Sequence, residues 1–369
     1  MRLTVDAQDR VWFTEFLGNK IGVYDQSSKH LDEYVIPTND SGPADLTFDK
    51  HGILWFTEAY ARQVGRFDPQ NQSFREYPLG SNTGAQYVAS PVGIAVDEEE
   101  HVWFADHGGN WIGEFDPSTQ QLILYPTHTP QPDQYPESIP NGILIDRQGR
   151  VWFTEHGGNS IAYFDTSNQT MVEFPIPTGP ISTALWLALA PNGNVWFTEW
   201  TTNKIGVVDA NQSVPISLQV SQNSLQLQTS QEKFLLLTIT PAHGFSGNGT
   251  LRYSWSDYYP PRDLNVTFST LNVSFADSSN ASIQIQLSNS VLAGNYTLGL
   301  ELATGNAFVS KMIQVNVMGT EAPSPMPSGN LLLDLAVALG AVVILTVSVV
   351  YWKKRSREEE IRSSTVSLT

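Results

Sequence analysis

The segment Val11-Trp12-Phe13-Thr14-Glu15 decides the fold, because close copies of it recur four more times along the 369-residue chain. The copies are Leu54–Glu58, Val102–Asp106, Val151–Glu155 and Val195–Glu199. Their tryptophans, Trp12, Trp55, Trp103, Trp152 and Trp196, lie 43, 48, 49 and 44 residues apart. A nearly constant spacing of this size indicates a repeat architecture, in which each repeat is one supersecondary unit.

Each unit holds four short apolar runs. In the second unit these are Pro43-Ala44-Asp45-Leu46, Leu54–Glu58, Gln63–Asp68 and Phe74-Arg75-Glu76-Tyr77-Pro78. The runs are rich in aromatic and β-branched residues and are separated by Asp, Gly and Asn, as is typical of strands joined by turns. A helical solenoid would need apolar residues at i, i+3 and i+4, which runs this short do not supply. The repeat therefore predicts an all-β fold, a β-propeller whose blades each contain four strands.

The propeller is expected over residues 1–212, with five visible blades. The first blade starts at the beginning of the chain, and the fifth lacks a clear outer strand. Propellers normally close by pairing their terminal strands within one blade, which leaves no long open edge. Two interpretations are open: a five-bladed ring, or five blades of a larger ring whose start lies outside this sequence. We favour the second, because it also accounts for the lack of an apolar signal segment before Asp6.

The repeat stops after residue 212, and residues 213–318 are expected to form an immunoglobulin-like β-sandwich that acts as a spacer. Apolar runs of strand length recur there, as in 234–240, 282–287 and 296–302. Asn-x-Ser/Thr sequons, which suit an exterior stalk, occur at Asn39, Asn71, Asn168, Asn211, Asn248, Asn265, Asn272, Asn280 and Asn295.

The C-terminal part predicts a membrane anchor. A linker, 319–330, precedes a 22-residue run, 331–352, whose single charge is Asp334. At 1.5 Å per residue a helix of this run is roughly 33 Å long, enough to cross a bilayer core. Basic residues open the tail, 353–369, which the positive-inside rule places in the cytoplasm. The protein is thus expected in the cell membrane as a single-pass protein, with its N-terminal domains outside.

Composition excludes some partners. With 41% hydrophobic and 15% charged residues the chain can form cores, and disorder is not expected. A net charge of −17 argues against nucleic acid, which requires a basic patch. The chain has no cysteine, so disulfides and thiolate metal sites are excluded.

Unusual loops are expected to gather on one face of the propeller. If the strands of a blade are lettered A to D from the inside outwards, the B–C turns and the D–A connections emerge on the same side. Two B–C turns read His107-Gly108-Gly109-Asn110 and His156-Gly157-Gly158-Asn159, and the two longest D–A connections are 80–90 and 127–139. We call this side the histidine face. Because pockets form where variable loops crown a rigid frame, it is the predicted site. Its candidate ligand-binding residues are Asn110, Asn159, Tyr87, His128 and Tyr135.

An acidic residue ends strand B in every blade, namely Glu15, Glu58, Asp106, Glu155 and Glu199. Carboxylates could bind a divalent cation such as Mg²⁺ or Ca²⁺, and the candidate metal ligands are Asp106, Glu155 and Glu199. A residue repeated in every blade is more often a structural hydrogen-bond acceptor, because a catalytic site usually breaks the symmetry. We favour the structural role.

The compound motif of Trp-Phe-Thr-Glu, then Asn-Lys-Ile-Gly, then an outer strand ending in Glu-Tyr-Pro or Glu-Phe-Pro resembles the streptogramin (virginiamycin B) lyase family over residues 1–210. The resemblance implies a seven-bladed ring and a Mg²⁺-dependent opening of an ester-linked antibiotic ring by elimination. It also implies a histidine general base in a Pro-His-Gly-Ile context at the start of strand A, and a metal-binding glutamate on strand B.

The strand-A positions that match this context contain no histidine. They read Pro43-Ala44-Asp45-Leu46, Pro91-Val92-Gly93-Ile94, Pro140-Asn141-Gly142-Ile143 and Thr183-Ala184-Leu185-Trp186. The base could lie in further blades, His107 and His156 could replace it as catalytic residues, or the chain could lack lyase activity. We favour the last interpretation.

Two functions follow. The first is a cell-surface recognition module for an extracellular small molecule, glycan or peptide. The second is a Mg²⁺-dependent lyase, or a hydrolase, acting on an extracellular ester or lactone.

Overall fold

The computed structural model of the protein describes residues 2–80, 90–127, 138–179, 182–210, 216–228, 231–242, 246–255, 264–275, 279–287, 293–304 and 308–318. Within these ranges every regular element is a β-strand. The all-β prediction is therefore confirmed for the described part of the chain.

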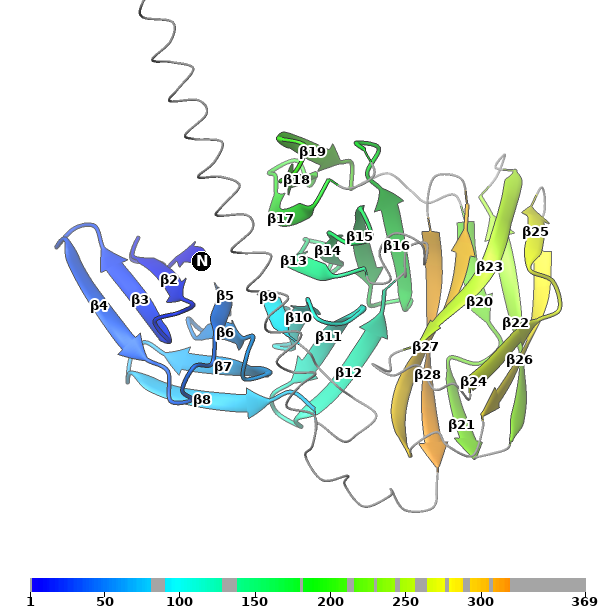
Figure 1. Ribbon diagram of the computed structural model, residues 1–369, viewed down its shortest axis with the longest axis horizontal. Helices are drawn as coiled ribbons and strands as arrows, with labels where there is room; N and C mark the ends of the chain where they lie inside the picture. The colour runs from blue at the N-terminus through cyan, green and yellow to red at the C-terminus, as the bar shows by residue number, and fades with distance from the viewer. Residues whose placement is uncertain are drawn as a thin grey trace, which may run out of the picture. The chain divides into compact units, whose positions relative to one another are not determined.

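The repeats form antiparallel sheets of the predicted kind, arranged side by side (Figure 1). The first blade contains β1 (Leu3–Val5), β2 (Val11–Glu15), β3 (Lys20–Asp25) and β4 (His30–Val35). The second contains β5 (Pro43–Phe48), β6 (Leu54–Glu58), β7 (Gln63–Asp68) and β8 (Ser73–Pro78). The third contains β9 (Pro91–Val96), β10 (Val102–Asp106), β11 (Trp111–Asp116) and β12 (Gln121–Pro126). The fourth contains β13 (Pro140–Ile145), β14 (Val151–Glu155), β15 (Ser160–Asp165) and β16 (Thr170–Pro175). The fifth contains β17 (Ala184–Leu189), β18 (Val195–Glu199) and β19 (Lys204–Val208).

Strand B builds the core of each blade. Trp103 and Trp152 are almost completely buried between sheets. The phenylalanine that follows lies over the glycine of strand C: a Cβ atom on Gly65 would come within 2.0 Å of the Phe56 ring. This close approach explains why the third run of most units carries a glycine, since that position has no room for a larger side chain.

An aspartate at the end of strand A fastens the tryptophan of strand B in four blades. The indole N–H of Trp12, Trp55, Trp103 and Trp152 donates to the carboxylate of Asp6, Asp49, Asp97 and Asp146 at 2.8, 3.0, 2.8 and 2.7 Å. The fifth blade has Ala190 at this position, and its Trp196 is 45% exposed. The aspartates, which the sequence pattern marks only as turn residues, are thus part of the repeated frame.

The described sheets do not form a closed ring. The fifth sheet has three strands, and β1 pairs only with β2. Apolar side chains are uncovered on the two terminal blades, where Ile205 is 70% and Leu3 67% exposed, whereas the equivalent Ile161 is fully buried. The larger ring remains a prediction.

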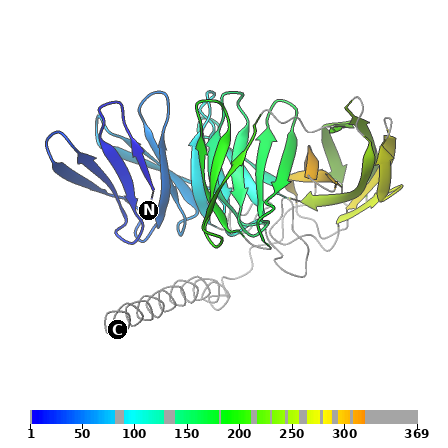
Figure 2. The same cartoon turned by 90° about the horizontal axis from the view of Figure 1, so that it is seen from above.

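Residues 216–318 form two further sets of strands around one apolar core. One sheet contains β20 (Ile216–Val220), β22 (Glu232–Pro241), β26 (Ser279–Leu287) and β24 (Leu264–Phe268). The other contains β21 (Ser224–Gln228), β28 (Phe308–Met318), β27 (Gly294–Ala303), β23 (Gly247–Trp255) and β25 (Asn272–Phe275). Both are visible beside the blades in Figure 2. The immunoglobulin-like assignment and the predicted domain boundaries remain predictions.

The second group of strands adds directly to the fourth blade. β28 pairs antiparallel with the outer strand β16, with Val172 opposite Val309. The N–H of Met312 donates to the carbonyl of Gln169 at 2.9 Å, and the Lys311 ammonium donates to the carbonyl of Asn168. Strand addition satisfies the edge of the blade and joins the two regions through backbone hydrogen bonds. This junction was not expected from the sequence, which indicated a simple spacer.

The predicted membrane segment, 331–352, lies outside the described residues, as do the linker and the tail. No helix in the described ranges is long and apolar enough to cross a membrane.

Candidate functional site

The histidine face is built on the ends of β10 and β14. The register places Pro91 opposite Asp106 and Pro140 opposite Glu155. In the next residue the N–H of His107 donates to the carbonyl of Ser90 at 2.9 Å, and that of His156 to the carbonyl of Ile139 at 3.2 Å. These hydrogen bonds join the B–C turn to the residue before strand A and so hold the backbone of each histidine in place.

The structure brings the two histidines of adjacent blades together. The rings of His107 and His156 lie with their centroids 4.8 Å apart at an interplanar angle of 74°. Burial lowers the pKa of His107 to about 4. Burial, followed by the neighbouring His107, also lowers the pKa of His156 to about 4. Both imidazoles are thus neutral near pH 7, and each offers one N–H donor and one acceptor nitrogen.

Buried polar atoms without a hydrogen-bond partner among the described residues lie at the same end of the fourth blade. They are His156 Nδ1, Asn141 Oδ1 and Glu155 Oε1. Buried polar groups in folded proteins are nearly always hydrogen-bonded to protein, water or ligand. Each of these atoms is therefore a position that a water molecule or a bound ligand can satisfy, as is the equivalent Glu58 Oε1 of the second blade.

Asn110 and Asn159 hold the frame. The Asn159 side chain accepts from the N–H and the hydroxyl of Ser182, both at 2.7 Å, and donates to the carbonyl of Ile176 at 2.9 Å. Asn19 makes the same bonds in the first blade, where no histidine is present, to Ser41 and Ile36. Asn110 likewise accepts from the N–H of Ser138 at 2.6 Å. The predicted ligand-binding role of both asparagines remains untested, and their geometry explains their recurrence structurally.

The acids at the end of strand B are also bonded within the fold. Asp106 accepts from the N–H of Ser90 at 2.6 Å, and Glu199 accepts from the hydroxyl of Thr202 at 2.7 Å. Burial, with Glu301 nearby, raises the pKa of Glu155 well above its usual range, which favours the protonated form. Burial raises the pKa of Glu58 to about 7.

Whether these acids suit a magnesium site depends on their ionisation. Without a cation, burial favours the protonated form of Glu155, whereas a bound Mg²⁺ takes oxygen ligands and would favour the ionised carboxylate. In the part of the chain that the structure describes, no three His, Cys, Asp or Glu side chains are grouped so as to hold a metal ion. The metal-binding prediction for Asp106, Glu155 and Glu199 stays a prediction.

Tyr87, His128 and Tyr135, the other predicted ligand-binding residues, lie in 81–89 and 128–137, outside the described residues.

The strand register corrects one part of the sequence alignment. Ala184 lies opposite Glu199, as Pro43 lies opposite Glu58, so the fifth strand A starts at Ala184 rather than at Thr183. A β-bulge follows in each of these strands, and the fifth blade has no proline to mark its start. The positions equivalent to the histidine of Pro-His-Gly-Ile are Ala44, Val92, Asn141 and Leu185. None of these four is a histidine.

A separate cavity of about 620 Å³ is lined by residues of the first and fifth blades, namely Arg2, Leu3, Val11, Phe13 and Trp186. The Arg2 guanidinium lies 4.2 Å from the centroid of the Trp186 ring, and its Nε donates to Asp45 at 3.0 Å. Burial raises the pKa of Asp45 although Arg2 lies beside it. The positive charge is thus already paired with a carboxyl group and an aromatic ring.

Comparison with known proteins agrees with the repeat. The model of the virginiamycin B lyase family matches residues 1–225, more than half of the chain. A streptogramin B lyase structure is 30% identical, with a TM-score of 0.50, and the match covers 57% of this chain and 65% of that protein. The chain thus corresponds to less than two thirds of that lyase's length.

A catalytically inactive virginiamycin B lyase from Staphylococcus aureus, with quinupristin, is 25% identical with a TM-score of 0.49, over 77% of this chain and 80% of that protein. No curated protein matches the sequence.

Proposed function

Because the chain belongs to the virginiamycin B lyase family, we propose that its propeller recognises a small extracellular ligand at the histidine face without cleaving it. The observation that carries this proposal is the neutral pair of His107 and His156, together with buried polar atoms of the fourth blade that have no hydrogen-bond partner among the described residues. Such a surface suits a ligand with amide or ester groups, such as a cyclic depsipeptide or another peptide.

The low basicity of the histidine pair supports recognition over proton abstraction. A general base works best when its pKa lies near the working pH. An imidazole with a pKa of about 4 stays neutral at pH 7 but accepts a proton weakly. His107 and His156 are therefore better suited to donating and accepting hydrogen bonds than to replacing the family's base.

The second candidate is a Mg²⁺-dependent lyase, or a hydrolase, acting on an extracellular ester or lactone. Family membership and the polar groups around Glu155 favour it. It requires a general base and metal ligands, and the candidate ligands are Asp106, Glu155 and Glu199. Under this alternative His107 and His156 would serve as the catalytic residues.

The remaining architecture is proposed together with recognition. The exposed apolar faces of the terminal blades support a larger, seven-bladed ring. The run 331–352 followed by basic residues supports a single-pass anchor, with the propeller and an immunoglobulin-like domain outside the cell.

The test uses the full chain in detergent or in membranes. A cyclic streptogramin B depsipeptide and its linear ester analogue are added with Mg²⁺ or with EDTA, and both binding and product mass are followed. We expect metal-independent binding with no change in ligand mass. Metal-dependent turnover would contradict noncatalytic recognition and support the lyase, and the absence of binding would contradict the choice of ligand class. Loss of binding in a His107→Ala/His156→Ala variant, with an unchanged melting temperature, would support the histidine face as the site.

A further inference from the structure

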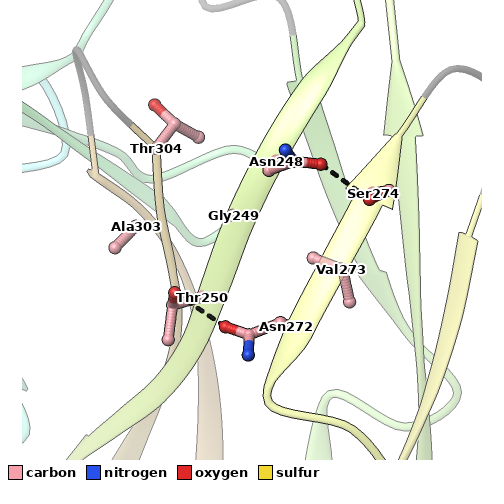
Figure 3. A pocket seen from close by; sticks show the side chains of 8 residues that line it. All are labelled: Asn248, Gly249, Thr250, Asn272, Val273, Ser274, Ala303 and Thr304. Carbon is pink, nitrogen blue, oxygen red and sulfur yellow. Dashed lines mark hydrogen bonds between the residues drawn. The ribbon is translucent and has the colours of Figure 1, made fainter.

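Two of the nine sequons lie side by side on one sheet. Asn248-Gly249-Thr250 is in β23 and Asn272-Val273-Ser274 is in the neighbouring β25. The strands are antiparallel, with Asn248 opposite Ser274 and Thr250 opposite Asn272. Because side chains alternate along a strand, these four polar residues share one face, and Gly249 and Val273 point to the other. Figure 3 shows this arrangement.

The two sequons are joined by hydrogen bonds in which the hydroxyl of each binds the asparagine of the other. The Ser274 hydroxyl donates to Asn248 Oδ1 at 2.6 Å, and the Thr250 hydroxyl donates to Asn272 Oδ1 at 3.2 Å. Both asparagines are exposed. In Figure 3 the amide nitrogen of each points away from its bonded hydroxyl. The carbonyl oxygen of each amide is thus held, while Nδ2, the atom to which an N-linked glycan is attached, takes no part in that hydrogen bond.

Two sequons of the propeller are arranged differently. Asn71 and Asn168 lie in turns between strands C and D, and their Nδ2 atoms donate to the carboxylates of Asp68 and Asp165 at 2.8 and 2.9 Å. Attaching a glycan there replaces one N–H of the amide and would disturb a charge-assisted hydrogen bond of the turn. These four sequons therefore differ. The side-chain nitrogens of Asn71 and Asn168 donate to carboxylates, whereas those of Asn248 and Asn272 have no acceptor among the described residues.

The surface around the pair has room for a sugar. Asn248 and Asn272 line an open hollow of about 590 Å³, together with Thr250, Ser274 and Thr304 among others. Its eight lining residues include no aromatic or charged side chain. Sites that bind a free ligand are usually lined by apolar and aromatic side chains with a few polar groups, so this hollow is better suited to holding an attached glycan than to binding a free one.

We propose that Asn248 and Asn272 form a doubly N-glycosylated patch, and that Asn71 and Asn168 are not modified. The reaction joins Nδ2 to the anomeric carbon of a sugar carried on a lipid pyrophosphate. The bond from that carbon to the phosphate oxygen breaks, the lipid pyrophosphate leaves, and the amide loses one proton to a base of the transferase. The inference rests on the proposed placement of these domains outside the cell.

The test is glycopeptide mass spectrometry on the full chain purified from the membranes of its native host. We expect glycan mass on the peptides with Asn248 and Asn272 and unmodified peptides with Asn71 and Asn168. The substitutions Asn248→Gln and Asn272→Gln should each remove the mass of one glycan, and the double substitution both. Ser274→Ala should remove the glycan at Asn272, and the matched control Ser274→Thr should retain it.

Two results would overturn the inference without contradicting the proposed placement. One is glycan absent from Asn248 and Asn272 in a chain whose N-terminal domains are digested by protease added to intact cells, which would leave the outward placement intact. The other is equal modification of all four sites, because the folded geometry would then have no influence. If protease does not reach these domains and no site is modified, both the inference and the proposed placement are wrong.

Discussion

The first two blades and the third and fourth blades solve the same packing problem with different residues. Phe16 and Tyr60, from the turns after strands β2 and β6, meet with ring centroids 5.0 Å apart at 72°. His107 and His156, from the turns after β10 and β14, meet at 4.8 Å and 74°. Two rings packed edge to face can thus fill the space between the turns of adjacent blades without any histidine.

The comparison separates frame from site. The asparagine bridge to the next connection is present on both sides, in Asn19 and in Asn159, so it cannot account for a local function. The imidazoles are found on one side only, and there they supply polar ring nitrogens that the rings of Phe16 and Tyr60 do not have. Replacing apolar rings by half-buried imidazoles costs desolvation energy, which a ligand-binding role would explain.

The frame should respond most strongly to the loss of a strand-A aspartate. Asp146→Ala removes the acceptor of the buried Trp152 indole at 2.7 Å and of the Arg150 guanidinium at 2.7 Å. Leaving a buried donor without a partner and losing a charge-assisted bond should lower the free energy of unfolding by about 3 kcal/mol. Urea unfolding measures it. Asp146→Asn, which keeps an oxygen acceptor, should lose less, and equal stability of all three proteins would show that the bond is not part of the frame.

The next largest effect per residue should be a loss of stability in acid that comes from the histidine pair and not from Phe16 and Tyr60. The folded pKa values of His107 and His156, about 4, lie below the ordinary value of 6.5, so the unfolded chain binds more protons between these pH values. Their stabilising contribution is complete above pH 6.5 and is lost as the pH falls towards 4. Since one pKa unit corresponds to about 1.4 kcal/mol, each of the two histidines should cost roughly 2 kcal/mol of unfolding free energy between pH 7 and pH 5.

Unfolding titrations of the wild type and of a His107→Phe/His156→Phe variant, which imitates the other side, measure the difference. The variant should lose less stability on acidification. Parallel pH curves for the two proteins would contradict neutral imidazoles in the folded state.

The smallest effect should come from the shared asparagines. Asn19→Ala and Asn159→Ala each remove bonds to a serine and to a carbonyl of the following connection. Each should reduce the unfolding free energy by about 1 to 2 kcal/mol, and by similar amounts, because the geometry is the same. If Asn159→Ala reduced ligand affinity clearly more than stability, Asn159 would be a ligand-binding residue and not only a structural one.

Much of the fold could be predicted from the sequence because the repeat is local. The spacing of Trp55, Trp103 and Trp152 places strand B, and the alternation of apolar runs and turn residues places the other strands. The hydrogen bond between Trp103 and Asp97 has a sequence signal too, because an aspartate recurs six residues before the tryptophan. The spacing alone does not show that the aspartate side chain turns back to the indole.

Other features needed the structure. The pairing of β16 with β28 joins residues about 140 positions apart, and no local pattern encodes such a contact. The fifth strand A has alanine where the second, third and fourth have proline, so its start was placed one residue too early until the register fixed it at Ala184. For the site, the sequence placed His107 and His156 on one face, but their ring contact and low basicity depend on packing between blades.

The most direct test of the recognition site is nuclear magnetic resonance of the imidazole nitrogens in ¹⁵N-histidine-labelled protein, with His107→Phe and His156→Phe variants for assignment. In the free protein both rings should stay neutral down to about pH 5. Addition of the streptogramin B depsipeptide should then shift the nitrogen signals of His107 and His156 while the ligand mass stays unchanged. Signals of these two rings that do not move under saturating ligand would contradict the histidine face as the recognition site.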